Sequence, residues 1–217
     1  MYDINDKGMW VNKKIIIGSQ DLLTIIDGNN DFNQTWGRLF VEGIEGEASV
    51  EEIIKRINYL FNAPFGYKAL TDEAHCDGHA EFKRFGEHCA IGSKGQKYHP
   101  SLLDVFLGVD ERLMKGMTPH LISHSISTSP QFDSHIGNII RRGIKRAFLC
   151  GWAFTHCVGD AACAYADQWV EEVYIVRDAT RSVLVPGLPP LEIPQLMTDK
   201  LHLHGVKFVL AENLVVA

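Results

Sequence analysis

The sequence lacks several features that would assign it to a specialised class of protein. No stretch approaches 18 consecutive apolar residues, so we predict no membrane span. The first 14 residues contain no apolar stretch of the kind that signal peptides need, so we do not expect secretion. The sequence has no internal repeat and no low-complexity tract. Basic residues are not in excess, because 21 Lys and Arg stand against 27 Asp and Glu, and we expect no nucleic-acid or membrane partner.

Cysteine is also scarce, with five residues in a chain of 217. An odd number of cysteines, in a chain long enough to build a core without disulfides, predicts reduced thiols and a cytoplasmic location. The composition, 46% hydrophobic and 22% charged, excludes a disordered, collagen-like or coiled-coil chain. We expect one domain over residues 1–217, with residues 1–14 as a peripheral extension.

Short apolar runs alternate with longer helix-like stretches along the chain. Ser49 followed by Glu52 has the pattern of a capping box that opens a helix. This alternation predicts an α/β fold, in which helices cover both faces of a parallel β-sheet in a Rossmann-like three-layer arrangement. The expected strands are 22–26, 66–71, 146–150, 173–176 and 206–210, and the expected helices are 49–61, 133–143, 159–170 and 195–204. Sites in such sheets lie at the carboxyl ends of the strands, so the residues after each strand matter most.

The segment after the third expected strand places a cysteine beside the start of a helix. Cys157 lies just before the Ala-rich stretch that begins at Gly159. The free N–H groups and dipole of a helix N-terminus stabilise a thiolate, so we expect a lowered pKa and a reactive thiol at Cys157. A buried cysteine that only packs is the alternative interpretation, and it is the one we adopt for Cys150 and Cys163.

Polar residues follow two other expected strands. Asp27 ends the first strand and can form a turn, cap a helix or act as a general base beside a nucleophile. Residues 72–79 (DEAHCDGH) contain carboxylate and imidazole groups that suit a divalent transition metal, and His88 can add a further ligand. A solvated polar loop is the alternative interpretation of this segment.

Together these stretches resemble the nicotinamidase branch of the isochorismatase-like cysteine hydrolases. The family's V-I-D-x-Q-N-D-F is similar to residues 24–32 (TIIDGNNDF), and its D-W-H-P-x-x-H-x-S-F is similar to residues 73–82 (EAHCDGHAEF). Its H-C-x-x-G-(S/T)-x-G resembles residues 88–95 (HCAIGSKG), its K-G pair resembles Lys115-Gly116, and its G-x-A-x-x-x-C-V resembles residues 151–158 (GWAFTHCV). The motifs occur in the family's order and cover nearly the whole chain.

The resemblance implies a role for each catalytic residue. Cys157 is expected to be the nucleophile, Asp27 to take its proton and later return one to the leaving ammonia, and Lys115 to favour the charged forms of both. Without the resemblance, Lys115 would be interpreted as a surface lysine. The family also implies a cis peptide bond between Trp152 and Ala153, and an oxyanion hole made by the backbone N–H groups of Ala153 and Cys157.

The resemblance further implies one divalent metal ion, with zinc as the first choice and manganese or iron as alternatives. Its expected ligands are a carboxylate and two histidines, and His75 and His88 match the histidines. Glu73 matches the family's aspartate without a gap, and Asp72 is its rival. His79 matches a histidine that binds the metal in only some members of the family.

Substrate binding is expected to involve Phe32, Phe85 and Trp152. The chain departs from the family at Asn29, which replaces a glutamine, and at His124, which replaces a tyrosine, so the pocket wall differs from the family pattern. The predicted activity is a metal-containing amidohydrolase that converts nicotinamide to nicotinate and ammonia through a thioester, in NAD salvage. Another small-carboxamide or N-carbamoyl amidohydrolase, and an inactive binding homologue, are the alternatives. The partner is a small-molecule carboxamide, and the oligomeric state stays open between monomer and homo-oligomer.

Overall fold

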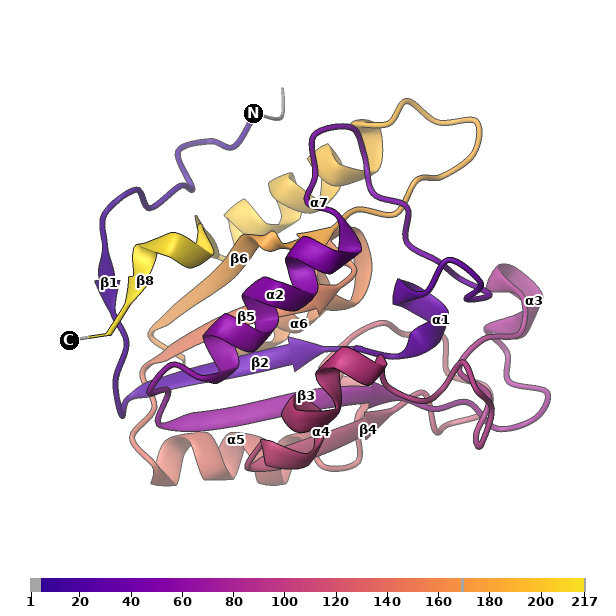
Figure 1. The fold of residues 1–217 in the computed structure, drawn as a ribbon, viewed down its shortest axis with the longest axis horizontal. Helices are drawn as coiled ribbons and strands as arrows, with labels where there is room; N and C mark the ends of the chain where they lie inside the picture. Colours follow the sequence, from indigo (N-terminus) through magenta and orange to yellow (C-terminus); the bar gives the residue numbers. More distant parts are fainter. Residues whose placement is uncertain (1–4, 169, 217) are drawn as a thin grey trace.

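The structure is a computed structural model that describes residues 5–168 and 170–216, so the first four residues of the expected N-terminal extension lie outside the described residues. In this part of the chain, six parallel strands form one sheet in the order β4-β3-β2-β5-β6-β7 (Figure 1). They are β2 (Asp21–Ile26), β3 (Tyr67–Glu73), β4 (Glu111–Lys115), β5 (Arg146–Trp152), β6 (Glu172–Arg181) and β7 (Lys207–Val209). Two short strands, β1 (Ile15–Ile16) and β8 (Leu214–Val215), pair separately.

Helices cover both faces of the six-stranded sheet (Figure 1). One face carries α2 (Val50–Phe61) and α4 (Leu103–Gly108), and the other carries α5 (Phe132–Arg141), α6 (Gly159–Ala166) and α7 (Glu192–Leu203). Two shorter helices, α1 (Asn30–Asn33) and α3 (Phe82–Phe85), lie in the loops beyond the strands. The expected α/β fold, with helices on both faces of a parallel sheet, is therefore confirmed.

The central strand β2 shows why the sequence adopts these layers. Leu23 and Ile25 belong to one hydrophobic cluster and Leu22 and Ile26 to the other, so successive side chains enter opposite cores. Every residue of β2 is buried, which explains its continuous apolar sequence.

The capping box that opens α2 is also present. The Ser49 hydroxyl accepts from the Glu52 N–H at 3.2 Å, and the Glu52 carboxylate accepts from the Ser49 N–H at 2.8 Å. These two bonds satisfy backbone donors that the first turn of a helix leaves unpaired. The start of α2 is therefore fixed by the local sequence.

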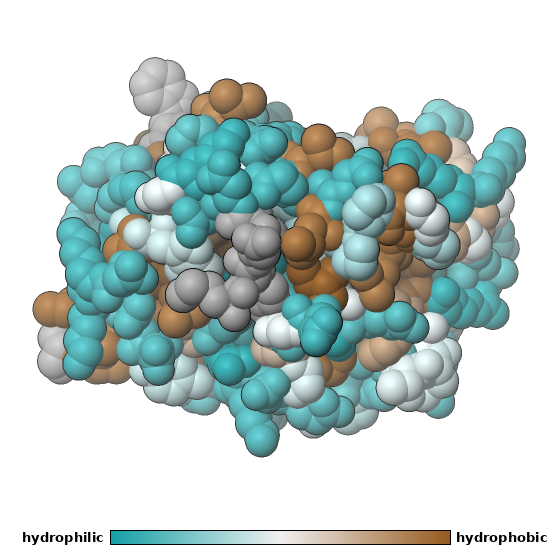
Figure 2. Space-filling view, turned by 90° about the horizontal axis from the view of Figure 1, so that it is seen from above, coloured by the Kyte–Doolittle hydropathy of each residue, from teal (hydrophilic) through white to brown (hydrophobic). Residues whose placement is uncertain are grey.

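The structure differs from the sequence expectations in a few elements. Strand β4 was not expected, because it is a short edge strand whose charged residues interrupt the apolar pattern. The helix expected over 159–170 ends at Ala166, whereas β6 continues to Arg181, beyond its expected end. Seen from above, the surface is mainly hydrophilic, with hydrophobic residues gathered in a few areas (Figure 2). None of the helices in the described ranges has the length and apolar character to span a bilayer.

The strand order reverses between β2 and β5. The chain proceeds outward from β2 through β3 to β4 on one side, and from β5 through β6 to β7 on the other. Loops that leave neighbouring strands in opposite directions open a crevice at the carboxyl ends of those strands. Asp27 follows β2, and the segment that contains Cys157 follows β5, so both lie at this crevice.

Candidate active site

The structure brings the three expected catalytic residues into one buried cluster. Asp27 directly follows β2, Lys115 is the last residue of β4, and Cys157 lies in a π-helical turn over Phe154–Val158. The Lys115 ammonium lies 2.9 Å from Asp27 Oδ2 and donates to Cys157 Sγ at 3.5 Å. All three residues are buried, so these contacts are shielded from water.

Asp27 is held in place by Thr71 on β3. The Asp27 N–H donates to Thr71 Oγ1 at 3.1 Å, and the Thr71 hydroxyl donates to Asp27 Oδ1 at 2.6 Å. The backbone of Asp27 has φ of 48°, in the left-handed region that aspartate tolerates better than most residues. This arrangement leaves Oδ2 facing Lys115.

Burial controls the protonation of the cysteine. It raises the pKa of the Cys157 thiol well above its usual value, Lys115 opposes this shift, and Asp27 adds to it. The lowered pKa expected from a helix N-terminus is therefore wrong, because the thiol is enclosed and lies in the turn before α6. Burial acts to lower the pKa of Lys115, but Asp27 and Cys157 raise it above its ordinary value. The resting cluster thus holds a neutral thiol beside a charged lysine.

The end of β3 decides which carboxylate faces the histidines. One oxygen of Glu73 forms an ion pair with Lys115, and Oε1 lies 3.2 Å from His75 Nε2. Successive side chains on a strand point to opposite faces of the sheet, so Asp72 points to the face opposite that of Glu73. Its carboxylate accepts from the side chains of Asn29 at 2.8 Å and Gln96 at 3.2 Å. The structure therefore brings Glu73, and not Asp72, to His75.

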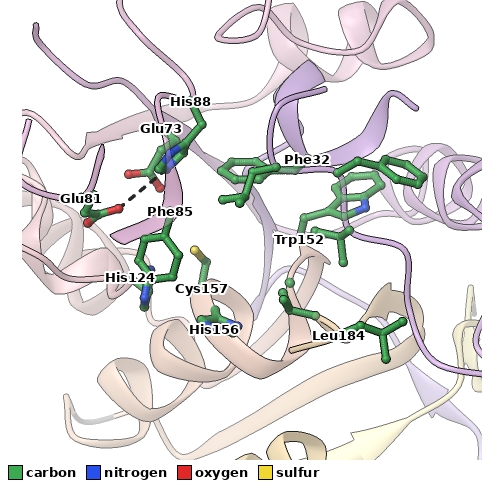
Figure 3. Close-up of a pocket in the computed structure, with 15 residues that line it drawn as sticks. Phe32, Glu73, Glu81, Phe85, His88, His124, Trp152, His156, Cys157 and Leu184 are labelled. Atoms are coloured by element: carbon green, nitrogen blue, oxygen red, sulfur yellow. Dashed lines mark ion pairs between the residues drawn. The ribbon is translucent and has the colours of Figure 1, made fainter. Parts of the chain in front are cut away.

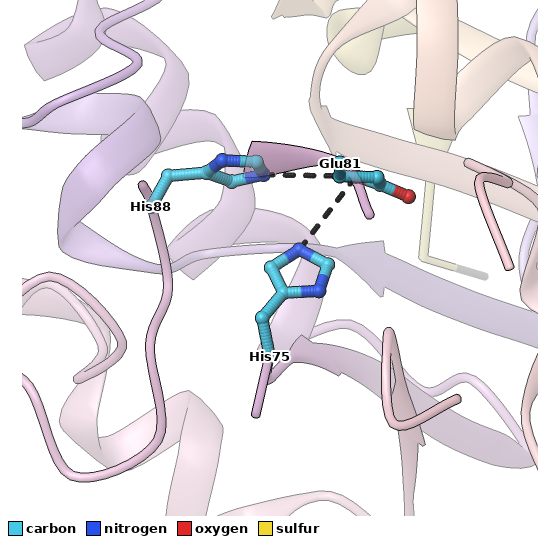
Figure 4. A group of neighbouring side chains, drawn as sticks. All are labelled: His75, Glu81 and His88. Carbon is cyan, nitrogen blue, oxygen red and sulfur yellow. Dashed lines mark ion pairs between the residues drawn. The ribbon is translucent and has the colours of Figure 1, made fainter. Parts of the chain in front are cut away.

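His75, His88 and Glu81 form a second buried group, in which the ligand atoms converge (Figure 4). Nε2 of each histidine lies 3.7 Å from Glu81 Oε2. Nδ1 of His75 lies 3.1 Å from the Gly116 carbonyl, and Nδ1 of His88 lies 2.9 Å from the Gly86 carbonyl. A carbonyl only accepts, so each Nδ1 carries the proton and each Nε2 presents a lone pair.

These residues fit a divalent cation. His75 Nε2 and Glu73 Oε1 are buried without a hydrogen-bond partner, although they face each other. A lone pair beside a carboxylate oxygen is unfavourable unless a cation joins them. Burial, with a smaller effect from His88, lowers the pKa of His75 to about 3, and burial also lowers the pKa of His88. Both imidazoles are therefore neutral, which is the form that binds metals.

Glu81 is the group that sequence reasoning missed. It stands where the family pattern has serine, and the only available signal was its position two residues after His79 in a loop of potential ligands. His79 itself uses both ring nitrogens: Nε2 lies 2.8 Å from the Thr118 carbonyl, and Nδ1 accepts from the Glu81 N–H at 3.3 Å. His79 thus holds the backbone of Glu81 and has no nitrogen left for a metal.

A cavity of about 170 Å³ reaches both groups (Figure 3). Cys157 lines it together with Glu73, Glu81 and His88, and the expected substrate-binding residues Phe32, Phe85 and Trp152 line it as well. Two further imidazoles, His124 and His156, complete the wall beside Cys157. Burial, followed by the effect of His156, lowers the pKa of His124 to about 4, and burial also lowers the pKa of His156, so both imidazoles are neutral near pH 7.

The backbone before Cys157 has the expected conformation. The peptide bond between Trp152 and Ala153 is cis, which confirms the sequence expectation. The Ala153 carbonyl accepts from the N–H groups of His156 and Val158, both at 3.0 Å, and so anchors the start of the turn. Ala153 and Cys157 both line the cavity, where their N–H groups are candidates for an oxyanion hole.

The remaining cysteines do not contribute a thiol to the cavity wall. All five cysteines are free. Cys150 and Cys163 are buried in the two hydrophobic clusters, as expected for packing residues. Cys89 is buried as well, and its N–H donates to the Asp31 carboxylate at 2.7 Å. Cys76 is partly exposed in the loop beside His75.

Comparison with solved structures places this geometry among known folds. PnC1 from L. infantum, in complex with nicotinate, is 26% identical, with a TM-score of 0.78 over 94% of this chain and 100% of its own. A pyrazinamidase of Pyrococcus horikoshii in complex with zinc is 23% identical, with a TM-score of 0.65 over 88% and 99%. An isochorismatase-like hydrolase from Alkaliphilus metalliredigens is 21% identical, with a TM-score of 0.66 over 89% and 96%.

No family model and no curated protein sequence matches the chain. The structural likeness nevertheless extends over nearly the full length of each of these three proteins. The chain has the fold of the isochorismatase-like hydrolases, and solved nicotinamidases are among the structures that share this fold, which confirms the expected resemblance.

Proposed function

We propose that the protein hydrolyses a small heteroaromatic carboxamide, with nicotinamide as the first candidate, to the carboxylic acid and ammonia. The observation that carries this proposal is the buried contact of Lys115 with both Asp27 and Cys157. This contact lies beside the group of His75, Glu81 and His88. A nucleophile on the cavity wall, a base joined to it through Lys115, and an adjacent cation site are the parts that amide hydrolysis needs.

The chemistry begins with transfer of the thiol proton. Asp27 accepts the proton of Cys157, and the ammonium of Lys115 stabilises the thiolate that forms. The thiolate attacks the amide carbon, and the N–H groups of Ala153 and Cys157 hold the resulting oxyanion. Protonated Asp27 returns its proton to the amide nitrogen, the C–N bond breaks, and ammonia leaves. Asp27 then takes a proton from water, whose oxygen attacks the thioester carbon, and the acid departs as Cys157 regains its proton.

The cation site serves to orient the ring. His75, Glu81 and His88, with Glu73 beside them, would hold a divalent ion, for which zinc is our first choice and manganese or iron the alternatives. When bound, such an ion supplies a Lewis-acid contact for a ring nitrogen. Phe32 lies close to His88, with ring centroids 6.0 Å apart, and can pack against the same ring.

Two other functions expected from the sequence receive less support. An N-carbamoyl amidohydrolase needs no ring nitrogen contact, so it leaves the histidines and Glu81 without a role. An inactive binding homologue leaves the buried Lys115 contacts without a role. The free cysteines support the cytoplasm as the location, where release of nicotinate would serve NAD salvage.

The direct test is release of ammonia from nicotinamide by purified protein loaded with Zn²⁺, Mn²⁺ or Fe²⁺. We expect turnover by the wild-type protein and by Cys163→Ala, and none by Cys157→Ala. Circular dichroism of both variants checks that they fold. Absence of turnover in the wild-type protein with each of the three metals would refute nicotinamide as the substrate.

A further inference from the structure

The cavity has two chemically different ends, one on each side of Cys157 (Figure 3). Glu73, Glu81, His88 and His124 lie on one side of the thiol, whereas Trp152 and Leu184 lie on the other. Trp152 and Leu184 belong to the second side, which we call the apolar end, and we assign to it the other apolar lining residues that cluster with Trp152, namely Leu39, Phe40, Val41 and Val183. All of these except Leu184 belong to one hydrophobic cluster or pack against it.

A substituent on the substrate cannot extend from the amide nitrogen or the carbonyl oxygen, because the proposed reaction places both atoms against protein groups. The leaving nitrogen must face Asp27, which is buried and in contact with Lys115 and Thr71, so a group on that nitrogen would meet these enclosed residues. In the proposed reaction the carbonyl oxygen points to the turn that holds Ala153 and Cys157, both of which line the cavity. Space beside the apolar end is therefore available only to a group carried by the ring.

A buried ion pair fixes the two segments that build the apolar end. The Glu47 carboxylate accepts from Arg177 Nη2 at 2.7 Å, from the Ser182 N–H and hydroxyl at 2.7 Å each, and from the Ile44 N–H at 3.0 Å. The Glu47 side chain is 0% exposed and that of Arg177 is 3% exposed. These bonds join residues 44–47, which follow Val41, to residue 182, which precedes Val183 and Leu184.

A buried ion pair of this kind adds little to the free energy of unfolding by itself. Two buried charges lose their hydration, and their attraction repays this only with good geometry and further hydrogen bonds. Here the geometry joins two loops, which Arg181 also links by donating to the Glu42 carbonyl, and both loops contribute wall residues to the cavity. Glu47 thereby acts on the site through the position of the loops, without lining the cavity.

We propose that the apolar end is a subsite for an apolar group on the ring of the carboxamide substrate, and that Glu47 with Arg177 positions this subsite. The inference rests on the proposed function, because it takes the carboxamide to be seated at Cys157. It extends the substrate class from nicotinamide to ring-alkylated heteroaromatic carboxamides. Specificity then depends on Trp152 at the end of β5 and on side chains from two loops outside the sheet.

The test uses binding, so that it does not depend on turnover. Calorimetry with zinc-loaded Cys157→Ala protein compares nicotinamide with its 5-methyl, 5-ethyl and 5-propyl derivatives. We expect Kd to fall about four-fold for each CH₂ group that is buried. The 5-hydroxymethyl derivative should bind more weakly than the 5-ethyl derivative of similar size. A series in which Kd stays constant or rises with chain length would overturn the inference.

A pair of matched variants tests whether the alkyl group binds at the apolar end. Leu184→Ala should reduce the fall in Kd along the alkyl series. The Kd of nicotinamide itself should change by less than about two-fold, which is clearly smaller than the change expected from losing one CH₂ contact. Leu188→Ala is the control, because Leu188 lies in the same loop, is similarly exposed (41% against 38%) and does not line the cavity. If both variants keep the full gain, the apolar group binds elsewhere and the inference fails.

Glu47→Gln tests the positioning role against Glu45→Gln, an exposed change in the same loop. In active enzyme we expect Glu47→Gln to raise KM for the 5-propyl substrate while kcat for nicotinamide stays near the wild-type value. Glu47→Asp should restore part of the loss, which a merely structural role would not predict. An equal effect on both substrates would overturn the positioning role, and if Glu47→Gln does not fold, the Leu184 and Leu188 pair still decides the subsite.

The two proposals fail separately. If wild-type protein releases no ammonia but the alkyl series still binds with rising affinity, the proposed reaction is wrong and the subsite stands. If nicotinamide is hydrolysed but the alkyl series shows no gain, the subsite is wrong and the reaction stands.

Discussion

Replacing Lys115 by methionine should destabilise the fold as well as stop the reaction. Lys115 is 1% exposed and is the cation that faces the carboxylates of Asp27 and Glu73, which are also buried. Methionine has nearly the same length and keeps the packing, but it leaves two buried negative charges without their cation. Removing one partner of a buried ion pair costs about 3–5 kcal/mol, because the remaining charge stays desolvated.

This loss is a large share of the free energy of unfolding, which is about 5–15 kcal/mol for a typical domain. A loss of 3 kcal/mol lowers Tm by about 6–12 °C in a protein of this size. We would measure urea and thermal unfolding of metal-free protein at pH 7.5. The control is Lys55→Met, which removes an exposed lysine and should change stability by less than about 0.5 kcal/mol.

A combined variant tests the reason for the loss. Lys115→Met together with Asp27→Asn and Glu73→Gln removes all three charges, so it should recover much of the stability that the single change loses. If Lys115→Met alone is as stable as wild type, the buried carboxylates do not depend on Lys115. If the triple variant is the least stable of the set, packing and not charge explains the loss. Either result would refute the electrostatic account of the cluster.

Three further predictions concern the base, the metal ligands and acid stability. Asp27→Asn should lower kcat by at least about 100-fold, measured as ammonia release, and a smaller loss would remove its role as general base. Glu81→Ala should lower the zinc content measured by mass spectrometry, whereas His79→Gln should retain zinc, and the reverse pattern would contradict the ligand assignment. In metal-free protein, His75 should make the unfolding free energy fall by about 2 kcal/mol from pH 7.5 to 5, because its folded pKa lies below its unfolded value and only the unfolded state takes up the proton in this range. In the His75→Asn variant, the unfolding free energy measured with urea should fall less between pH 7.5 and 5, by the same amount of about 2 kcal/mol.

Much of the fold could be predicted from local sequence because its signals are local. The capping box of Ser49 and Glu52 fixes the start of α2, and the apolar run of β2 reflects burial on both faces. The edge strand β4 could not be predicted, since its mixed sequence, ERLMK, resembles an exposed segment. Its existence matters for the site, because β4 ends on Lys115 and delivers it to Asp27.

The candidate site was predictable to the extent that each residue follows a strand. Asp27 and Cys157 fall at the crevice because the strand order reverses between β2 and β5. Local reasoning about Cys157 gave the wrong direction of the pKa shift, because it considered the helix N-terminus and could not know the depth of burial. Glu81 was overlooked for a related reason, since the fold of its loop, and not its spacing, turns its carboxylate toward His75 and His88.

The sequence by itself determined the alternation of strands and helices and the order of the motifs, since these depend on neighbours along the chain, whereas the cis bond before Ala153 was expected only from the family resemblance. Tertiary structure alone decided which carboxylate meets the histidines, that the thiol stays protonated, and that Glu47 and Arg177 join two loops around the cavity. The physical reason is that desolvation and ion pairing depend on distance in space. Residues from separate strands and loops contribute to desolvation and to ion pairing, and no local sequence pattern shows which of them will lie close together.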